Sequence, residues 1–410
     1  MKQLLFLPIL TILLLCGAES VALENSVKFT PLFDLRIRQE VLDGVLFFTP
    51  TPDRQWVRFR TRAGLKVNSD HHAFTLRMAN EHRRFIIPEP AEFSWDELII
   101  DQAKWDWAPD EETTLTLGRQ NIIWDDGFLV LEGHPLDGSR SIYMDGVRLR
   151  TTLSGEKLDI FAVHNNKRDP YVLAGDKARA LSDTDEMGVG AKITLGKHRF
   201  AAIWKHDDDP DGMLPLLNTY TLDGRFIWGN KDAGSYTFEA AVQYQDGIPE
   251  TTPDSPTTNG FNLALQAQAK GHFYGPVDGD IGFFLYSENF RTPWGRWPKW
   301  SELYIYTLLN EGGDGRVHVA AWENIAAPRF NLHYPISENY QARFGLAYLL
   351  APKPDWDGRG LLMQTELKID LVKGLNGHLL WEMFDAGFYH NQHGVPPVHF
   401  LRWQIAYKFN

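Results

Sequence analysis

The sequence is poor in cysteine and, beyond its first residues, in long apolar runs. Cys16 is its only cysteine and falls in a segment that secretion would remove, so neither a disulfide framework nor a thiolate metal site is expected. A membrane-spanning helix needs about 20 apolar residues in succession, and no segment beyond residue 22 approaches that length. Helical membrane proteins are therefore excluded.

Positive charge is also in the minority. The 410 residues include 41 basic and 53 acidic side chains, which gives a formal net charge of −12. A chain this acidic is not expected to bind nucleic acid or to spread over anionic lipid. The total charge does not fix the sign of the electrostatic field inside a pore.

Residues 1–22 are predicted to be a secretory signal peptide. Lys2 supplies the positive start, residues 4–15 supply the apolar run, and small residues at 16–18 and 20–22 offer two cleavage sites, so cleavage after residue 18 is the alternative. A lipid anchor on Cys16 is a rival interpretation, but the bulky residue before it argues against that anchor.

Beyond residue 30, apolar and charged residues alternate. Phe33 and Leu35 share one parity while Arg36 and Arg38 share the other, which predicts a strand with one apolar and one charged face. The same pattern returns in residues 57–67. In a water-soluble sandwich the charged face would be solvated, whereas in a barrel it would line a wet lumen.

The recurrence of such stretches favours the barrel. Short turns, such as Asn376-Gly377, alternate with long polar connections, such as 207–217 and 247–259, as is typical of outer-membrane barrels. We therefore predict an all-β fold: a transmembrane antiparallel β-barrel of 18 strands, with 16 as the alternative, formed by residues 23–410 as a single domain with loops folded into the lumen. The alternating stretches are 33–41, 57–67, 74–78, 98–105, 115–117, 147–153, 158–162, 187–195, 200–204, 220–228, 236–243, 261–269, 281–286, 303–309, 317–321, 330–334, 344–350, 363–371, 379–383 and 401–409.

The last stretch is the most regular. Residues Leu401, Trp403 and Phe409 share one parity with two further apolar residues, and outer-membrane barrels commonly end in such a strand; an ordinary sandwich edge strand is the alternative. Tryptophans near the junctions of strands and loops are predicted to form girdles at the membrane interfaces. These are Trp105, Trp107, Trp124, Trp294, Trp297 and Trp300.

Residues 115–149 are predicted to control the pore. Two strand-like ends flank a long piece rich in Gly, Asp and aromatic residues, and connections of that length are usually functional or disordered. We interpret the piece as a constriction loop, in which opposed charges create a transverse field. Its arginines Arg119 and Arg140, with Arg148 and Arg150, are predicted to face the acids Asp125, Asp126, Glu132, Asp137 and Asp145.

Arginines on the polar parity of the strands are predicted to line the lumen. Guanidinium groups stay charged at any physiological pH and can bind carboxylates through two parallel hydrogen bonds. A compatible alternative is that they form structural ion pairs with neighbours such as Asp34, Glu40 and Asp223. Arg119 shares parity with Leu117, so it points inward only if a bulge shifts the register. The predicted lining residues are Arg36, Arg38, Arg58, Arg60, Arg62, Arg77, Arg119, Arg148, Arg150, Arg225 and Arg402.

Several short segments resemble the alginate-export family of outer-membrane porins. They include 118–120, Asp145-Gly146-Val147-Arg148-Leu149, 222–225, 238–244 and 324–335, and they occur in order along nearly the whole chain. The resemblance implies a monomeric barrel, usually of 18 strands, with an arginine-lined lumen partly obstructed by folded-in loops. The best-known activity of that family is export of the polyanion alginate, although this chain is more acidic than the resemblance would lead one to expect.

We predict a porin rather than an enzyme. It would pass small hydrophilic anionic solutes, such as acidic sugars or oligosaccharides, through the outer membrane of a Gram-negative bacterium, in contact with lipid and lipopolysaccharide and without metal or cofactor. Anion selectivity is expected because arginines outnumber acids in residues 36–38 and 58–66.

The alternative is a barrel hydrolase whose loops carry the catalytic groups. His134, Asp137 and Ser139 lie close in sequence, and His206 precedes the acidic run 207–209. No Gly-x-Ser-x-Gly motif supports that reading. We interpret the acidic run as a solvated loop or a weak divalent-ion site near lipopolysaccharide. The glycines at 188 and 190 are interpreted as small inward residues that make room, not as a phosphate cradle.

Overall fold

The structure is a computed structural model, and the statements below concern the residues that it describes. These are 22–23, 27–43, 53–87, 95–132, 143–178, 180–182, 184–211, 216–230, 234–247, 260–294, 324–353, 355–387 and 396–409. The predicted signal peptide lies outside them, apart from Ala22.

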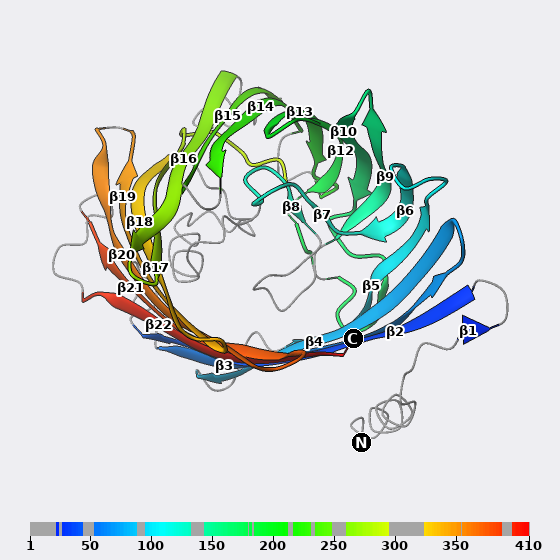
Figure 1. Ribbon diagram of the computed structural model, residues 1–410, viewed down its shortest axis with the longest axis horizontal. Coiled ribbons are helices and arrows are strands. Elements are labelled where there is room, and N and C mark those ends of the chain that lie inside the picture. The colour runs from blue at the N-terminus through cyan, green and yellow to red at the C-terminus, as the bar shows by residue number, and fades with distance from the viewer. Residues whose placement is uncertain are drawn as a thin grey trace.

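Eighteen antiparallel strands close into one barrel (Figure 1). The ring closes where β2 (Val27–Asp43) pairs with β3 (Arg54–Asn68) on one side and with β22 (Val398–Phe409) on the other. The remaining strands, in order around the ring, are β4 (His72–Ile87), β5 (Trp95–Trp107), β6 (Thr114–Gln120), β9 (Met144–Leu153), β10 (Glu156–Asn165), β12 (Asp185–Leu195), β13 (His198–Asp208), β14 (Leu217–Asn230), β15 (Gly234–Gly247), β16 (Gly260–Tyr274), β17 (Val277–Tyr286), β18 (Ile325–Ser337), β19 (Tyr340–Ala351), β20 (Asp357–Val372) and β21 (Leu375–Ala386).

Four short strands lie outside this ring order. β1 (Ala22–Leu23) pairs with the start of β2, and β11 (Val172–Ala174) pairs with β5. β7 (Ile122–Ile123) and β8 (Leu131–Glu132) pair with each other inside the ring (Figure 1). Among the described residues, no helix is long and apolar enough to span a membrane.

The predicted fold class and strand number are confirmed. Each stretch predicted between residues 33 and 286 and between 330 and 409 lies in its own strand of the ring. The predicted strands 303–309 and 317–321 lie outside the described residues. β17 pairs directly with β18, with Tyr286 opposite Ile325, so the ring is complete without them.

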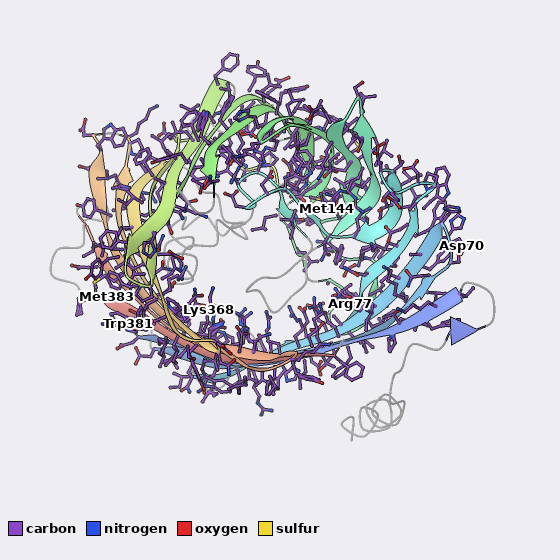
Figure 2. The ribbon with its side chains drawn as sticks, viewed as in Figure 1. Asp70, Arg77, Met144, Lys368, Trp381 and Met383 are labelled. Atoms are coloured by element: carbon purple, nitrogen blue, oxygen red, sulfur yellow. The ribbon has the colours of Figure 1, made fainter. Side chains whose placement is uncertain are left out.

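Strand periodicity separates the two faces of the wall. Large apolar side chains are exposed on the outside, for example Leu222 at 67% and Ile281 at 64%, whereas charged residues of the opposite parity are buried inside. Figure 2 shows side chains on both faces, with Arg77 on the inner one. An apolar outer surface on a closed ring with no free strand edge suits a lipid bilayer.

The predicted tryptophan girdle is only partly right. Trp107 is 38% exposed on the outer side, as the prediction requires. Trp124 and Trp294 are each only 1% exposed and lie inside the barrel, so their assignment to the girdle was wrong. Both belong to loops that fold inward, which strand parity does not report. Trp297 and Trp300 lie outside the described residues.

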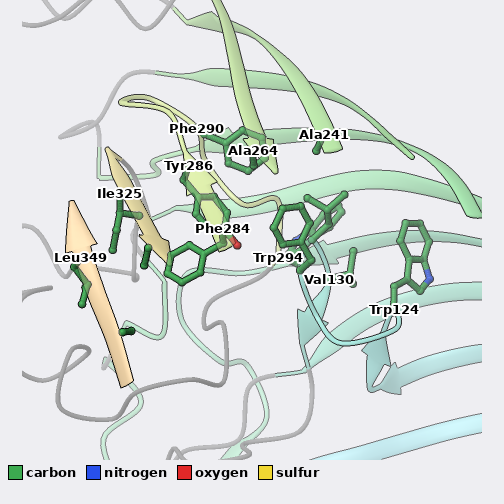
Figure 3. Packing of buried hydrophobic residues seen from close by; sticks show 14 of the residues in the cluster. Trp124, Val130, Ala241, Ala264, Phe284, Tyr286, Phe290, Trp294, Ile325 and Leu349 are labelled. Atoms are coloured by element: carbon green, nitrogen blue, oxygen red, sulfur yellow. The ribbon is translucent and has the colours of Figure 1, made fainter. Parts of the chain in front are cut away.

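The main apolar cluster lies inside the barrel. Figure 3 shows Trp124, Val130 and Trp294, from two loops that enter the barrel, in one cluster that also includes Ala241 and Ala264 of the inner wall. The inward loops are thus held by a packed core.

Candidate pore constriction and arginine-lined lumen

Two loops that enter the lumen are joined to each other. The first, residues 121–132, follows β6, and the second, residues 287–294, follows β17. The amide of Leu131 donates to the carbonyl of Trp294 at 3.1 Å, and the amide of Trp294 donates to the carbonyl of Leu129 at 3.1 Å. The sequence predicted only the first loop as a constriction; the buried tryptophan in the second was the available signal.

Aromatic contacts fix the first loop to the wall of β10. The Trp124 ring lies 5.0 Å from that of Phe161, and Phe161 lies 5.3 Å from Trp294. The Trp124 indole also donates to Asp159 at 3.1 Å. Such ring pairs contribute stabilisation beyond that of the apolar area that they bury, so they favour one position of the loop on the wall.

Two glycines of β12 leave the space that these rings occupy. A Cβ on Gly190 would lie 2.5 Å from the Phe161 ring, and a Cβ on Gly188 would lie 2.7 Å from the Trp294 ring. This confirms the interpretation that these glycines make room inside the barrel. The rings that fill the room come from the inward loops and from β10.

The tip of the first loop points its carboxylates at the wall. Asp125 adopts a positive φ of 53°, which turns the chain sharply at the tip. Asp126 lies 2.9 Å from the Arg225 guanidinium of β14 and accepts a hydrogen bond from Gln266 at 3.2 Å. Asp125 forms an ion pair with Arg199 of β13.

The wall supplies further carboxylates around this tip. Arg199 is also ion-paired with Asp223 and Glu239, and Arg225 lies 2.6 Å from Glu239. Burial alone would raise the pKa of Asp126, but the Arg225 guanidinium outweighs that effect and holds the pKa below its ordinary value. Asp126 is therefore charged, and both tip acids are ion-paired with arginines of the wall.

The predicted partners of the tip acids were wrong. Arg148 is bound to Asp159 of β10 at 2.6 Å, and Arg150 is exposed, whereas Arg199 and Arg225 hold the tip. Arg225 was among the predicted lining residues, but Arg199 was missed. Arg199 lies one residue before a predicted strand, and extending the parity of that strand would have placed it inside.

On the side of the barrel opposite β13, β14 and β15, the inner wall carries rows of arginines, which we call the arginine ladder (Figure 1). Arg38 of β2 lies opposite Arg58 of β3, which in turn lies opposite Arg83 of β4. Arg36 lies opposite Arg60 in the next row. The ladder consists of Arg36, Arg38, Arg58, Arg60, Arg62, Arg77, Arg83 and Arg402.

Carboxylates lie between the rungs of the ladder. Glu40 lies 2.6 Å from Arg58, 3.6 Å from Arg38 and 3.8 Å from Arg402. Like charges directly opposite each other destabilise a strand pair, so these acids hold the ladder together. The five inner-wall acids around the ladder are Asp34, Glu40, Glu81, Glu97 and Asp101.

The ladder keeps a positive surplus. Among the described residues of β2, β3, β4, β5 and β22, the eight arginines stand against five buried carboxylates, a difference of three positive charges. Arg62 is held by Asp34 at 2.7 Å, and Arg77 is held by Asp101 at 2.9 Å. The structural ion pairs foreseen as an alternative are thus present on the same wall where the arginines outnumber the buried acids.

Arg119 does not line the lumen. β6 pairs with β9 without a register shift, so no bulge turns Arg119 inward, and it shares the side of Leu117, which is 39% exposed outside. Its guanidinium binds Asp145 at 2.6 Å and Asp169 at 3.0 Å instead. The prediction of Arg119 as a lining residue is corrected for this reason.

The residues proposed for a hydrolase are not brought together in the part of the chain that the structure describes. His206 lies on the outer parity of β13 and contacts Asn218 at 3.0 Å. Asp209 is only 5% exposed and binds Lys167 at 2.6 Å, so the interpretation of the acidic run as a solvated loop is wrong for Asp209, whereas Asp208, at the end of β13, is exposed. No group of three metal-ligating residues occurs among the described residues. His134, Asp137, Ser139, Arg140 and the side chain of Glu132 lie outside them.

Solved structures identify the architecture. The chain superposes on OccAB4 from Acinetobacter baumannii with a TM-score of 0.59 and 10% identity, covering 92% of this chain and 98% of that one. It has the fold of outer-membrane porins. A BenF-like porin from Pseudomonas fluorescens gives a TM-score of 0.59 at 10% identity, covering 93% and 98%.

A third neighbour was solved with a small molecule. OpdK from Pseudomonas aeruginosa with vanillate gives a TM-score of 0.56 at 10% identity, covering 92% of this chain and 98% of that one. No protein-family model and no curated protein sequence matches the chain. At such low identity the likeness concerns the fold, and the chemistry of the lumen must be argued from this chain's own residues.

Proposed function

We propose that the protein is a passive channel in the outer membrane of a Gram-negative bacterium, and that it passes small hydrophilic anions. The observation that carries the proposal is the positive surplus of the arginine ladder, which faces a lumen narrowed by the two inward loops. Guanidinium groups remain charged at any physiological pH, so this surplus is permanent.

The loop acids lie on the wall opposite the ladder, not beside its arginines. Asp125 and Asp126 are bound by Arg199 and Arg225 on the far wall. Around this tip, Asp125, Asp126, Asp223 and Glu239 stand against Arg199, Arg225 and Lys192, so the anion preference is proposed to arise on the opposite side of the lumen, where the ladder lies. Interactions within about 8 Å act with little screening at physiological salt, which matters most in a narrow passage.

Carboxylates are the solute class that the ladder suits best. Neighbouring rungs offer planar donors that can bind a carboxylate through two hydrogen bonds. Vanillate, present in the OpdK structure, is itself a carboxylate, which supports this choice by analogy of fold only. We propose acidic sugars and short acidic oligosaccharides as solutes, and lipid and lipopolysaccharide as the surroundings of a monomeric barrel.

The resemblance to alginate exporters narrows this proposal further. It would make the solute an acidic polysaccharide chain rather than a single sugar acid. A liposome-swelling series separates the two: entry of a uronic acid monomer but not of alginate oligomers assigns small-solute passage, whereas entry of both supports the finer assignment.

Bilayer recording tests the proposed function directly. The purified protein is expected to form channels whose reversal potential in a potassium chloride gradient has the anion-selective sign. A cation-selective sign would refute the role of the ladder, and absence of channels would refute the function itself. Substituting His206 is expected to leave the conductance unchanged, because that side chain faces outward.

A further inference from the structure

We propose that Arg119 is a positioning residue. It holds together the ends of β6 and β9, which flank the constriction loop, and it stabilises the short pairing of β11 with β5 in the barrel wall. It thereby sets the width of the pore and limits its fluctuations. The effect on the pore rests on the proposed channel function. The stabilisation of the pairing between β11 and β5 does not depend on that function and is tested separately by thiol labelling.

The pairing of β11 with β5 exists because β6 is shorter than its neighbour. β6 pairs with β5 only from Leu115 to Arg119, opposite Trp107 to Ala103. Beyond Ala103 the edge of β5 is taken by β11, which comes from the loop after β10. An open strand edge is costly in a membrane wall, so β11 has to stay in place.

The pairing of β11 with β5 is short. Ile99 lies opposite Val172, and Leu98 lies opposite Ala174. The amide of Ile100 donates to the carbonyl of Tyr171 at 3.2 Å. We call this contact, residues 98–100 with 171–174, the seam. So few backbone bonds hold a strand weakly by themselves, and local opening starts at such places.

Arg119 binds three different elements around the seam. Nε and Nη2 donate to the two carboxylate oxygens of Asp145 on β9, at 2.8 and 2.6 Å. Nη1 donates to the carbonyl of Ile100 on β5 at 2.8 Å and to Asp169, just before β11, at 3.0 Å. One guanidinium therefore links β5, β6, β9 and the segment that carries β11.

Two tyrosines enclose the guanidinium. Its central carbon lies 3.2 Å from the centre of the Tyr143 ring and 4.3 Å from that of Tyr171, and Arg119 is 2% exposed. Cation–π contacts are strongest for such desolvated groups. Because Asp169 also accepts a bond from the amide of Tyr171 at 2.9 Å, the clamp orders the chain entering β11.

The same contact fixes the neck of the constriction loop. The chain leaves β6 at Gln120 and returns in β9 at Met144, so Arg119 and Asp145 flank the two ends of the loop. The amide of Asp145 is itself bound to Asn165 of β10 at 3.0 Å. A fixed neck limits the positions that the loop can reach in the lumen.

Thiol labelling of Val172→Cys tests the seam. Val172 is 5% exposed, so in an otherwise unchanged barrel with Cys16 absent a water-soluble maleimide should react slowly. Adding Arg119→Gln is expected to speed labelling about tenfold, which corresponds to about 1.4 kcal/mol of lost opening free energy. Arg150→Gln, at an exposed arginine away from the seam, is the matched control and should leave the rate unchanged.

Arg119→Lys separates a clamp from a simple positive charge. A lysine ammonium cannot serve Asp145, Ile100 and Asp169 together while stacked between two rings, so labelling should be fast in this variant too. Recovery of the slow rate by lysine would overturn the clamp. If Arg119→Gln fails to fold, Asp169→Asn in the same assay removes one of its links and should give a smaller acceleration.

Bilayer recording then tests the effect on the pore. Arg119→Gln is expected to give larger and noisier currents with frequent sublevels, while its reversal potential stays that of the parent because Arg119 is outside the lumen. A large change in reversal potential, or steady parental currents, would overturn the positioning role. If the parent forms no channels, the proposed function fails, and the labelling rates still decide whether Arg119 seals the seam.

Discussion

The Glu40 carboxylate lies 2.6 Å from Nε of Arg58, although the residue directly opposite Arg58 on β2 is another arginine, Arg38. Glu40 thus lies diagonally between neighbouring arginines, and its negative charge reduces the repulsion between them. Glu40 contacts three arginines whose charges would otherwise repel one another, which makes it a structural residue of the lumen.

Glu40→Gln is expected to destabilise the barrel strongly. Glu40 is fully buried and lies within 4 Å of three arginines, so its loss leaves charges without compensation. Removing one partner of a buried ion pair costs about 3–5 kcal/mol. Urea unfolding of the protein in lipid vesicles, followed by tryptophan fluorescence, measures the change.

Glu288→Gln is the matched control for that substitution. Glu288 pairs with Lys353 at 3.0 Å, but both side chains are about half or more exposed, at 48% and 67%. Exposed pairs contribute about 0–1 kcal/mol, so the unfolding midpoint should barely move. Equal losses of unfolding free energy in Glu40→Gln and Glu288→Gln would show that burial does not determine how much an ion pair contributes to stability.

Replacing both Arg38 and Arg58 by Gln is expected to weaken anion preference. The ladder would keep six arginines against five carboxylates, a surplus of one where there were three. The reversal potential should move toward zero, most clearly at low salt, where screening is weakest. Arg168→Gln, in an exposed pair with Asp211 outside the strands, should leave it unchanged.

Gly190→Ala is expected to displace the constriction loop. The added methyl group would lie 2.5 Å from Phe161 and 2.9 Å from Trp124, so the rings have to move. Such overpacking typically costs about 1–3 kcal/mol. Single-channel conductance should rise or become unstable. Gly271→Ala, whose new Cβ would have its nearest neighbour at 3.7 Å, is the control and should behave as the parent.

The contact between the loop tip and the barrel wall is expected to persist at moderately acidic pH. Burial opposes ionisation of Asp126, but Arg225 holds its pKa below 3.8. A depressed pKa contributes stability that is present above the ordinary value and is lost only as the pH falls through the lowered one. The contact of Asp126 with Arg225 should therefore persist from neutral pH down to about pH 4.

Asp126→Asn provides the comparison for that pH profile. The variant lacks the ion pair with Arg225 at every pH, so its conductance should already differ from the parent at neutral pH. Asp125, Asp223 and Glu239 also face this cluster and remain in the variant. If the difference in conductance between the parent and Asp126→Asn disappeared between neutral pH and pH 5, a depressed pKa at Asp126 would be contradicted.

The sequence alone determined the barrel and its strands. A strand has a repeat of two residues, so an alternating pattern such as that of residues 33–41 reports both the strand and the face that its arginines take. This is a local property, and it holds wherever the chain remains regular. The inward side of Arg38 and Arg58 could therefore be predicted without knowing their neighbours.

Tertiary structure alone decided which charges meet and which loops enter the lumen. Asp125 meets Arg199 across 74 positions of sequence, and Trp294 joins Leu131 across a still longer stretch of sequence, so no local pattern encodes either contact. Arg119 belongs to the same class. Its parity was readable from the sequence, but the acid and carbonyl groups that it binds gather only because β6 stops short and β11 takes its place beside β5.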